Sequence, residues 1–252
     1  MFNLPFDKTI KNMKIKATDG ELGHCTDLLF DERQWTARYL VVETGSWLFG
    51  RTVLIPIVSV DRIDVDADLI EVCLSQEEVK NAPDINTDAP VSRRHEINIM
   101  DYYAYGYYWA GGLWGTGLDP MALRTTLDAP EEKIPPKQEG DPNLRSVNEI
   151  IGYQIDTKDD ETGAVNDAYV NARDWRITYW VVKTGGWFSG KEVLLAADWI
   201  TDITWTDQAI STDLTSKQIE SAPEFEPPLD EEYEQALAAH YDRDQPTLRY
   251  QA

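Results

Sequence analysis

Histidine is the side chain most often used for acid–base chemistry near neutral pH, and this chain has His24, His95 and His240. The three lie in separate segments. None belongs to a recurring Ser/His/Asp or Cys/His arrangement of the kind that activates a nucleophile. The sequence therefore predicts no catalytic residues, and we do not expect an enzyme.

Three aspartates, Asp64, Asp66 and Asp68, have the spacing that opens a calcium-binding loop. The glycine needed at the sixth position is Leu69, and the glutamate needed at the twelfth is Ser75. A solvated turn explains this segment better, and the acidic run at 156–161 has the same interpretation. The glycine-rich stretch 111–117 lacks the Lys-Ser/Thr pair that follows a phosphate-binding loop. We therefore expect no metal site and no cofactor.

The chain has 252 residues and a formal net charge of −22, with 45 acidic and 23 basic residues. Charge of this sign repels nucleic-acid phosphates and anionic membrane surfaces. No apolar run is long enough to cross a bilayer, and residues 1–16 lack the apolar stretch of a secretory signal. We expect a cytoplasmic protein without nucleic-acid binding or membrane insertion, and Cys25 and Cys73 suit that reducing compartment.

The strongest signal is an internal repeat with an offset of 140 residues. It runs without a gap from Glu21/Glu161 to Pro83/Pro223. Thr44-Gly45-Ser46-Trp47 corresponds to Thr184-Gly185-Gly186-Trp187. Asp27 and Asp167 also correspond, and we expect both carboxylates to accept hydrogen bonds from turn amides. Two homologous domains follow from this match.

Each repeat has the pattern of short strands separated by glycine turns. Residues 35–43 and 175–183 alternate in the way that indicates a strand with one buried face. Ser75 with Glu78, and Thr215 with Gln218, are capping-box pairs that predict a short helix after the last strand. The predicted fold class is all-β with short helices, as two small six-stranded antiparallel β-barrels in tandem.

A weaker match with an offset of 138 residues continues past the barrels. It predicts a helix after Pro90 and another after Pro228, with Ser92 or Asp230 near the N-cap. The Tyr- and Trp-rich run at 102–109 is expected to pack on something, whereas 119–146 resembles an extended linker. The predicted organisation is a first barrel at 1–85, a linker at 86–145, a second barrel at 146–225 and a helical or extended tail at 226–252.

Residues 20–31, 38–42 and 44–56 together resemble the PRC-barrel domain, and the second repeat resembles it less closely, with Asp160 and Ala196 in place of Gly20 and Pro56. The resemblance implies a small barrel. Such barrels occur in the photosynthetic reaction-centre H subunit and in a ribosome-maturation factor, where they dock to proteins. The resemblance therefore implies protein binding rather than chemistry.

Aromatic and apolar residues are the candidates for such an interface, because aromatic anchors dominate interface energetics. Trp47 and Trp187 keep their place in the repeat while their neighbours change, although plugging a barrel end is an equally simple role. Leu40 and Trp180 lie on a strand that is apolar on both faces and needs a cover. The other barrel, the Tyr-rich run or another protein could supply it. The candidates are Trp47, Trp187, Leu40, Trp180, Tyr107 and Trp109.

The leading hypothesis is thus a non-enzymatic docking module whose partner is another protein. The first alternative is a structural or stress-related protein that acts by self-association as a homo-oligomer. The second is a small-ligand-binding barrel, which a narrow six-stranded barrel disfavours because its own side chains fill it.

Overall fold

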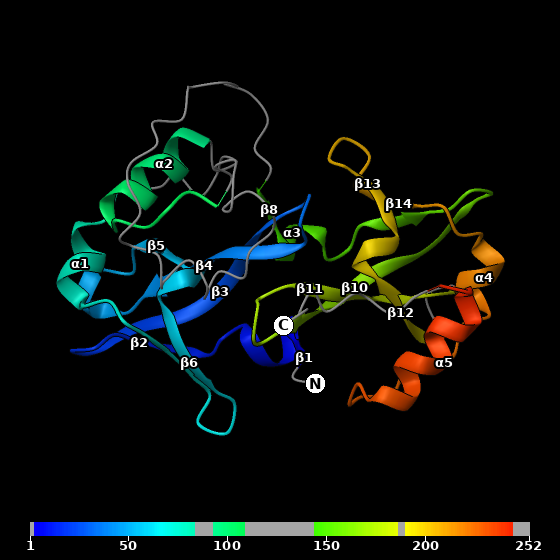
Figure 1. Cartoon of the computed structure of the whole chain (residues 1–252), viewed down its shortest axis with the longest axis horizontal. Helices are drawn as coiled ribbons and strands as arrows, with labels where there is room; N and C mark the ends of the chain where they lie inside the picture. The colour runs from blue at the N-terminus through cyan, green and yellow to red at the C-terminus, as the bar shows by residue number, and fades with distance from the viewer. Residues whose placement is uncertain (1–2, 84–92, 109–143, 186–189, 244–252) are drawn as a thin grey trace. The chain divides into compact units, whose positions relative to one another are not determined.

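A computed structural model describes residues 3–83, 93–108, 144–185 and 190–243 (Figure 1). The chain divides into two compact units. The first-repeat unit comprises Lys8–Val147 and Ala172–Arg176, and the second-repeat unit comprises Met1–Asp7, Asn148–Asn171 and Ile177–Ala252. No helix in the described part of the chain is long and apolar enough to span a membrane.

Each unit contains one seven-stranded sheet, which confirms the prediction of two mostly β domains with short helices. The sheet of the first-repeat unit runs, in spatial order, through β5 (Thr52–Pro56), β4 (Thr36–Thr44), β3 (Glu21–Asp31), β2 (Lys14–Lys16), β7 (Leu69–Val72) and β6 (Val60–Asp64), with β8 (Leu144–Ser146) also paired to β3. The sheet of the second-repeat unit runs through β12 (Glu192–Ala196), β11 (Ile177–Lys183), β10 (Glu161–Asn171), β9 (Gln154–Asp156), β14 (Ala209–Thr212) and β13 (Ile200–Thr204), with β1 (Asn3–Pro5) also paired to β10.

The strand pairing differs from the prediction in two details. The pairs β2–β7 and β9–β14 are parallel, so neither sheet is wholly antiparallel. Parallel pairing needs a long connection, and most of a repeat lies between the two strands of each pair. Among the described residues each sheet runs as an open path from one end strand to the other, without a hydrogen-bonded closure.

Both faces of the central strand β4 are buried. Leu40 and Val42 point to one face and Tyr39 and Val41 to the other, because successive side chains of a strand alternate. Helix α2 (Arg93–Tyr102) and the residues after it cover the second face. That cluster contains Tyr39, Val41, Leu54, Val58, Ile99, Met100, Tyr108 and Leu144. The Tyr-rich run therefore packs on this strand, but on the face of Tyr39 and Val41 and not on the face of Leu40 for which a cover was predicted.

The predicted helices form where the capping residues stand. Ser75 and Thr215 make capping boxes at the starts of α1 (Gln76–Asn81) and α4 (Ser216–Glu220). An oxygen of the Asp230 carboxylate accepts the Tyr233 amide at 2.8 Å at the start of α5 (Glu231–Tyr241). Single helical turns occupy Phe6–Ile10, Ser46–Leu48, Ile57–Ser59, Val147–Ile150 (α3) and Ala197–Trp199.

The boundaries predicted from the repeat do not coincide with the units. Helix α2, in the predicted linker, and strand β8, at the predicted border between the linker and the second barrel, pack within the first-repeat unit. Residues 3–7, predicted to belong to the first barrel, lie in the second-repeat unit. Long-range strand pairing decides both placements, and local sequence patterns do not record it.

Candidate docking surface

The loop from Thr44 to Arg51 presents an aromatic side chain to solvent. Phe49 is 97% exposed, whereas the next most exposed large apolar side chain described, Trp205, is 42% exposed. Exposing a whole phenyl ring has no benefit for the stability of the unit, because burial is what makes such a ring stabilising. The ring is therefore the first candidate for an interaction site.

Hydrogen bonds hold this loop in one conformation. The Trp47 indole N–H donates to the Leu22 carbonyl at 2.7 Å, and the Thr44 hydroxyl donates to the Arg51 carbonyl at 2.7 Å. Leu48 is buried next to Phe49. Trp47 is itself half-buried, so its indole fixes the loop while part of its surface stays accessible.

Two consecutive left-handed residues turn the loop outward at Phe49. Phe49 has φ 57° and Gly50 has φ 70°. The left-handed region costs a residue with a side chain about 1 kcal/mol, and such strain persists only where the surroundings impose it. The fixed loop therefore holds the Phe49 ring in solvent.

Arg51 fastens the loop to the C-terminal end of α1. Its guanidinium donates to the Lys80 carbonyl at 3.1 Å and to the Ala82 carbonyl at 2.9 Å. The second repeat has the same fastening, because Lys191 Nζ donates to the Ala222 carbonyl at 2.6 Å. The tip of that second loop, including Trp187, lies outside the described residues.

Exposed carboxylates line the segments that meet this loop. Glu21 adjoins Leu22, which binds Trp47, and Glu43 precedes Thr44. Asp19 accepts the Gln76 amide at 2.8 Å at the start of α1. We call the exposed side chains of Asp19, Glu21, Glu43, Glu77 and Glu78 the acidic rim.

The other predicted interface residues have different settings. Leu40 and Trp180 are fully buried in their own units, so neither side chain is accessible to a partner in this structure. Tyr107 packs partly buried against the α2 cluster, and its hydroxyl donates to Asp101. Trp109 lies outside the described residues. Phe49 was not among the predicted residues, because its counterpart Ser189 made it look variable.

Each unit also buries a glutamate beneath its tail helix. In the first-repeat unit the Tyr108 hydroxyl donates to Glu96, and the Arg38 guanidinium stacks 4.1 Å from the Tyr108 ring centroid. Burial lowers the pKa of Arg38, while the charges of Tyr108, Asp31 and Glu96 act in the opposite direction.

In the second-repeat unit the corresponding carboxylate is Glu234, beside the Tyr179 hydroxyl. Burial raises the pKa of Glu234, and the nearby Tyr179 hydroxyl offsets part of that shift. Burial also raises the pKa of Tyr179, and the Glu234 charge adds to that effect. Arg38 belongs to β4 and Tyr179 to β11, so both clusters lie where a tail helix meets a sheet.

The histidines and aspartates considered first for chemistry contact other parts of the fold. His24 lies 3.7 Å from Glu43, and His240 contacts the Gln218 carbonyl at 2.8 Å in the other unit. Both recurring aspartates accept backbone amides, but these belong to the strands and not to turns as predicted: Asp27 accepts the Leu28 amide at 2.8 Å, and Asp167 the Ala168 amide at 2.7 Å. Over the described ranges, no group of three or more His, Cys, Asp or Glu side chains could hold a metal ion.

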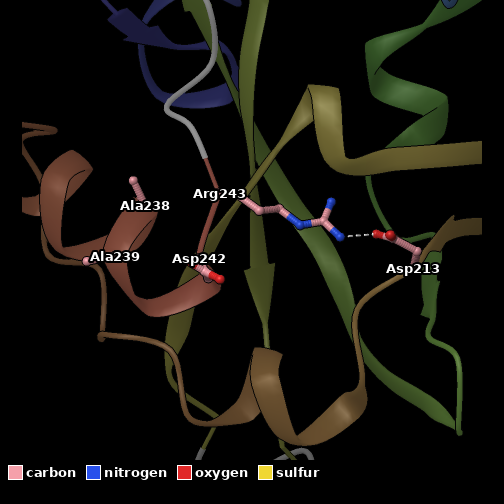
Figure 2. A pocket seen from close by; sticks show the side chains of 5 residues that line it. All are labelled: Asp213, Ala238, Ala239, Asp242 and Arg243. Carbon is pink, nitrogen blue, oxygen red and sulfur yellow. Dashed lines mark hydrogen bonds and ion pairs between the residues drawn. The ribbon is translucent and has the colours of Figure 1, made fainter.

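A shallow open hollow of about 620 Å³ lies next to the C-terminal end of α5 in the second-repeat unit. Figure 2 shows Arg243 reaching across it to form an ion pair with Asp213. The guanidinium also lies 6.0 Å from the Trp199 ring centroid. The ion pair uses two of the three charged side chains that line the hollow, and through it Arg243 attaches the end of α5 to the loop at Asp213.

Comparison with protein families identifies the chain. The PRC-barrel domain model matches residues 5–78 and 142–217, more than half of the sequence, and the chain therefore belongs to the PRC-barrel family with two such domains. A search of curated proteins finds none that matches this chain.

Proposed function

We propose that this tandem PRC-barrel protein is a non-enzymatic docking module that binds another protein through the loop Thr44–Arg51. The observation that carries the proposal is the 97% exposed Phe49 ring on a loop whose conformation is already fixed. Buried aromatic anchors supply a large part of the binding energy at interfaces. A loop held in place before binding loses little conformational entropy when it docks.

The acidic rim indicates the chemistry of the partner. Five exposed carboxylates lie on segments that adjoin the loop or are hydrogen-bonded to it or to one another, and the chain as a whole carries a formal charge of −22. Lysines and arginines around an apolar pocket would complement this surface and accelerate association. We therefore expect a protein with an apolar pocket for Phe49 and a basic margin, and no nucleic acid.

Self-association through the same loop is the competing function. A second copy would bring its own acidic rim against the first, and like charges facing one another at an interface are unfavourable. The charge of the surface thus favours a different, basic protein over another copy of this chain.

The experiment places a photo-cross-linking amino acid at position 49 of the full chain in cells of the source organism. The cross-linked protein is identified, purified and titrated against wild type, Phe49→Ser and Val65→Ser. Ser is the residue of the second repeat at this place, and Val65, 39% exposed, is an apolar control at another turn.

Loss of an anchor worth about 2 kcal/mol weakens binding about 30-fold. We expect that loss for Phe49→Ser, unchanged binding for Val65→Ser, and weaker binding at higher salt. Equal affinity for all three proteins would refute the proposed surface. Cross-links only to a second copy would replace docking by self-association.

A further inference from the structure

The sheet of the first-repeat unit is completed by a strand that precedes the second repeat. Strand β8 pairs antiparallel with the end of β3, with Leu29, Phe30 and Asp31 opposite Ser146, Arg145 and Leu144. Its side chains add further contacts to the first-repeat unit: Ser146 donates to Asp27, and Arg145 forms an ion pair with Glu32 at 2.5 Å.

The sheet of the second-repeat unit is completed in the same way by a strand that precedes the first repeat. Strand β1 pairs antiparallel with the end of β10, with Asn3 opposite Asn171 and Leu4 opposite Val170 (Figure 1). Just after β1, the Asp7 amide donates to Asp167 at 2.8 Å. The recurring aspartates, Asp27 and Asp167, therefore bind the incoming segment at equivalent places.

Each long strand changes its neighbour at that aspartate. Before it, β3 pairs with its own repeat, since the Cys25 amide donates to the Met13 carbonyl at 2.9 Å; the Val165 amide donates to Tyr153 at 2.9 Å in the second repeat. After it, the neighbour is the strand from the other repeat. The chain passes from one unit to the other in the helical turn before β2 or β9.

Buried side chains make the exchange more than a few backbone hydrogen bonds. Leu4 and Phe6 are buried in the second-repeat unit, and Leu144 and Val147 are buried in the first-repeat unit. A fully buried side chain of this size contributes about 1.5–3 kcal/mol. The turn Ala172–Arg176 adds a further link, because the Trp175 carbonyl accepts the Ala37 amide at 2.8 Å in the first-repeat unit.

We propose that the ends of β3 and β10 are strand-acceptor sites, each filled by the strand that precedes the other repeat, so that the two repeats interlock as obligatory partners. Each half of the sequence supplies a strand to the unit that the other half mainly builds. The halves should therefore stay associated when the segment between them is cut. The proposal does not depend on the docking function.

The test uses full chains that carry Cys73→Ser and a protease site inserted within 109–143. One variant adds Asn3→Cys and Asn171→Cys, which are opposite one another in the observed register. The matched control adds Asn3→Cys and Asp31→Cys, because Asp31 is the repeat counterpart of Asn171 and would face residue 3 if β1 paired with its own repeat. Both variants are oxidised, cut and run on a non-reducing denaturing gel.

We expect the 3–171 pair to join the two fragments covalently. Residues 3 and 31 lie in the same fragment, so for that pair we expect no disulfide, seen as an unchanged mobility of the fragment on reduction. We also expect the cut chain without the added cysteine pair to remain one particle of about the mass of the whole chain, 28.7 kDa, by light scattering without denaturant. Fragments that separate without denaturant, or fragments left unjoined by the 3–171 pair, would overturn the proposal. A particle of twice that mass would also overturn it, by showing exchange between two copies.

Discussion

The two units bury a glutamate in equivalent places but surround it with different charges. Glu96 in the first-repeat unit shares its environment with Arg38, which is 4% exposed. The repeat counterpart of Arg38 is Thr178, so no arginine stands at this place beside Glu234. Thr178 instead donates to the Tyr169 carbonyl at 3.2 Å. One fold thus places a buried carboxylate either near a buried cation or in a site that raises its pKa.

The largest expected effect comes from making the first-repeat unit resemble the second. Arg38→Thr removes the buried cation with its contact to the Tyr108 ring and its hydrogen bond to Gln34, and it leaves the carboxylates of Asp31 and Glu96 without that charge. Leaving a buried charge uncompensated costs about 3–5 kcal/mol. We expect that loss in the free energy of unfolding, measured by urea denaturation with tryptophan fluorescence.

Arg62→Thr is the control for Arg38→Thr, because Arg62 pairs with Glu71 at 2.9 Å on the surface. An exposed pair contributes at most about 1 kcal/mol. If Arg38→Thr costs no more than Arg62→Thr, the charge of Arg38 does not stabilise the unit.

Replacing Glu96 and Glu234 by glutamine should change the free energy of unfolding in opposite directions. Glu96→Gln removes the charge that accepts the Tyr108 hydroxyl near Arg38 and should cost about 2 kcal/mol at pH 7. Glu234 has a raised pKa in the folded protein, so the folded state binds its proton more tightly than the unfolded state. Its contribution to stability is therefore full below pH 4.5 and is lost as pH rises.

Glu234→Gln should consequently be more stable than wild type at neutral pH and should show a weaker fall of stability with pH. Urea denaturation between pH 4 and pH 8 measures both variants. If Glu96→Gln and Glu234→Gln destabilise the protein equally at pH 7, the two buried glutamates do not differ as proposed.

The two units differ in their buried glutamates, but removing a helix cap should cost the same stability in each. The hydroxyl of Ser75 accepts the Glu78 amide at 3.2 Å, and that of Thr215 accepts the Gln218 amide at 3.3 Å. Ser75→Ala and Thr215→Ala should each cost about 1 kcal/mol in thermal or urea unfolding. A difference above about 1 kcal/mol between them would show that tertiary contacts, not the cap, set the cost.

The smallest expected effect is that of Phe49→Ser on stability. The ring is 97% exposed and the second repeat carries Ser189 at this place. Surface substitutions of this kind stay within about 0.5 kcal/mol. Leu48→Ser, at the buried neighbour, should cost about 2 kcal/mol in the same urea assay. A comparable loss for both would mean that Phe49 packs on the unit and is not free to dock.

Local patterns determined much of this fold. The repeat offset, the alternation in 35–43 and 175–183, and the capping boxes at Ser75 and Thr215 predicted two β domains with short helices. Asp230 predicted the start of α5. These features involve residues a few positions apart, so their hydrogen bonds and burial follow from the sequence itself.

The tertiary structure alone decided the features that join distant segments. It placed β1 on β10 and β8 on β3, made β2 parallel to β7, and put Leu40 and Trp180 out of reach while leaving Phe49 in solvent. The alternating pattern of a strand is the same whichever neighbour the strand pairs with. The sequence of an apolar residue likewise does not show whether other elements cover its side chain. Only the three-dimensional packing selects between these outcomes.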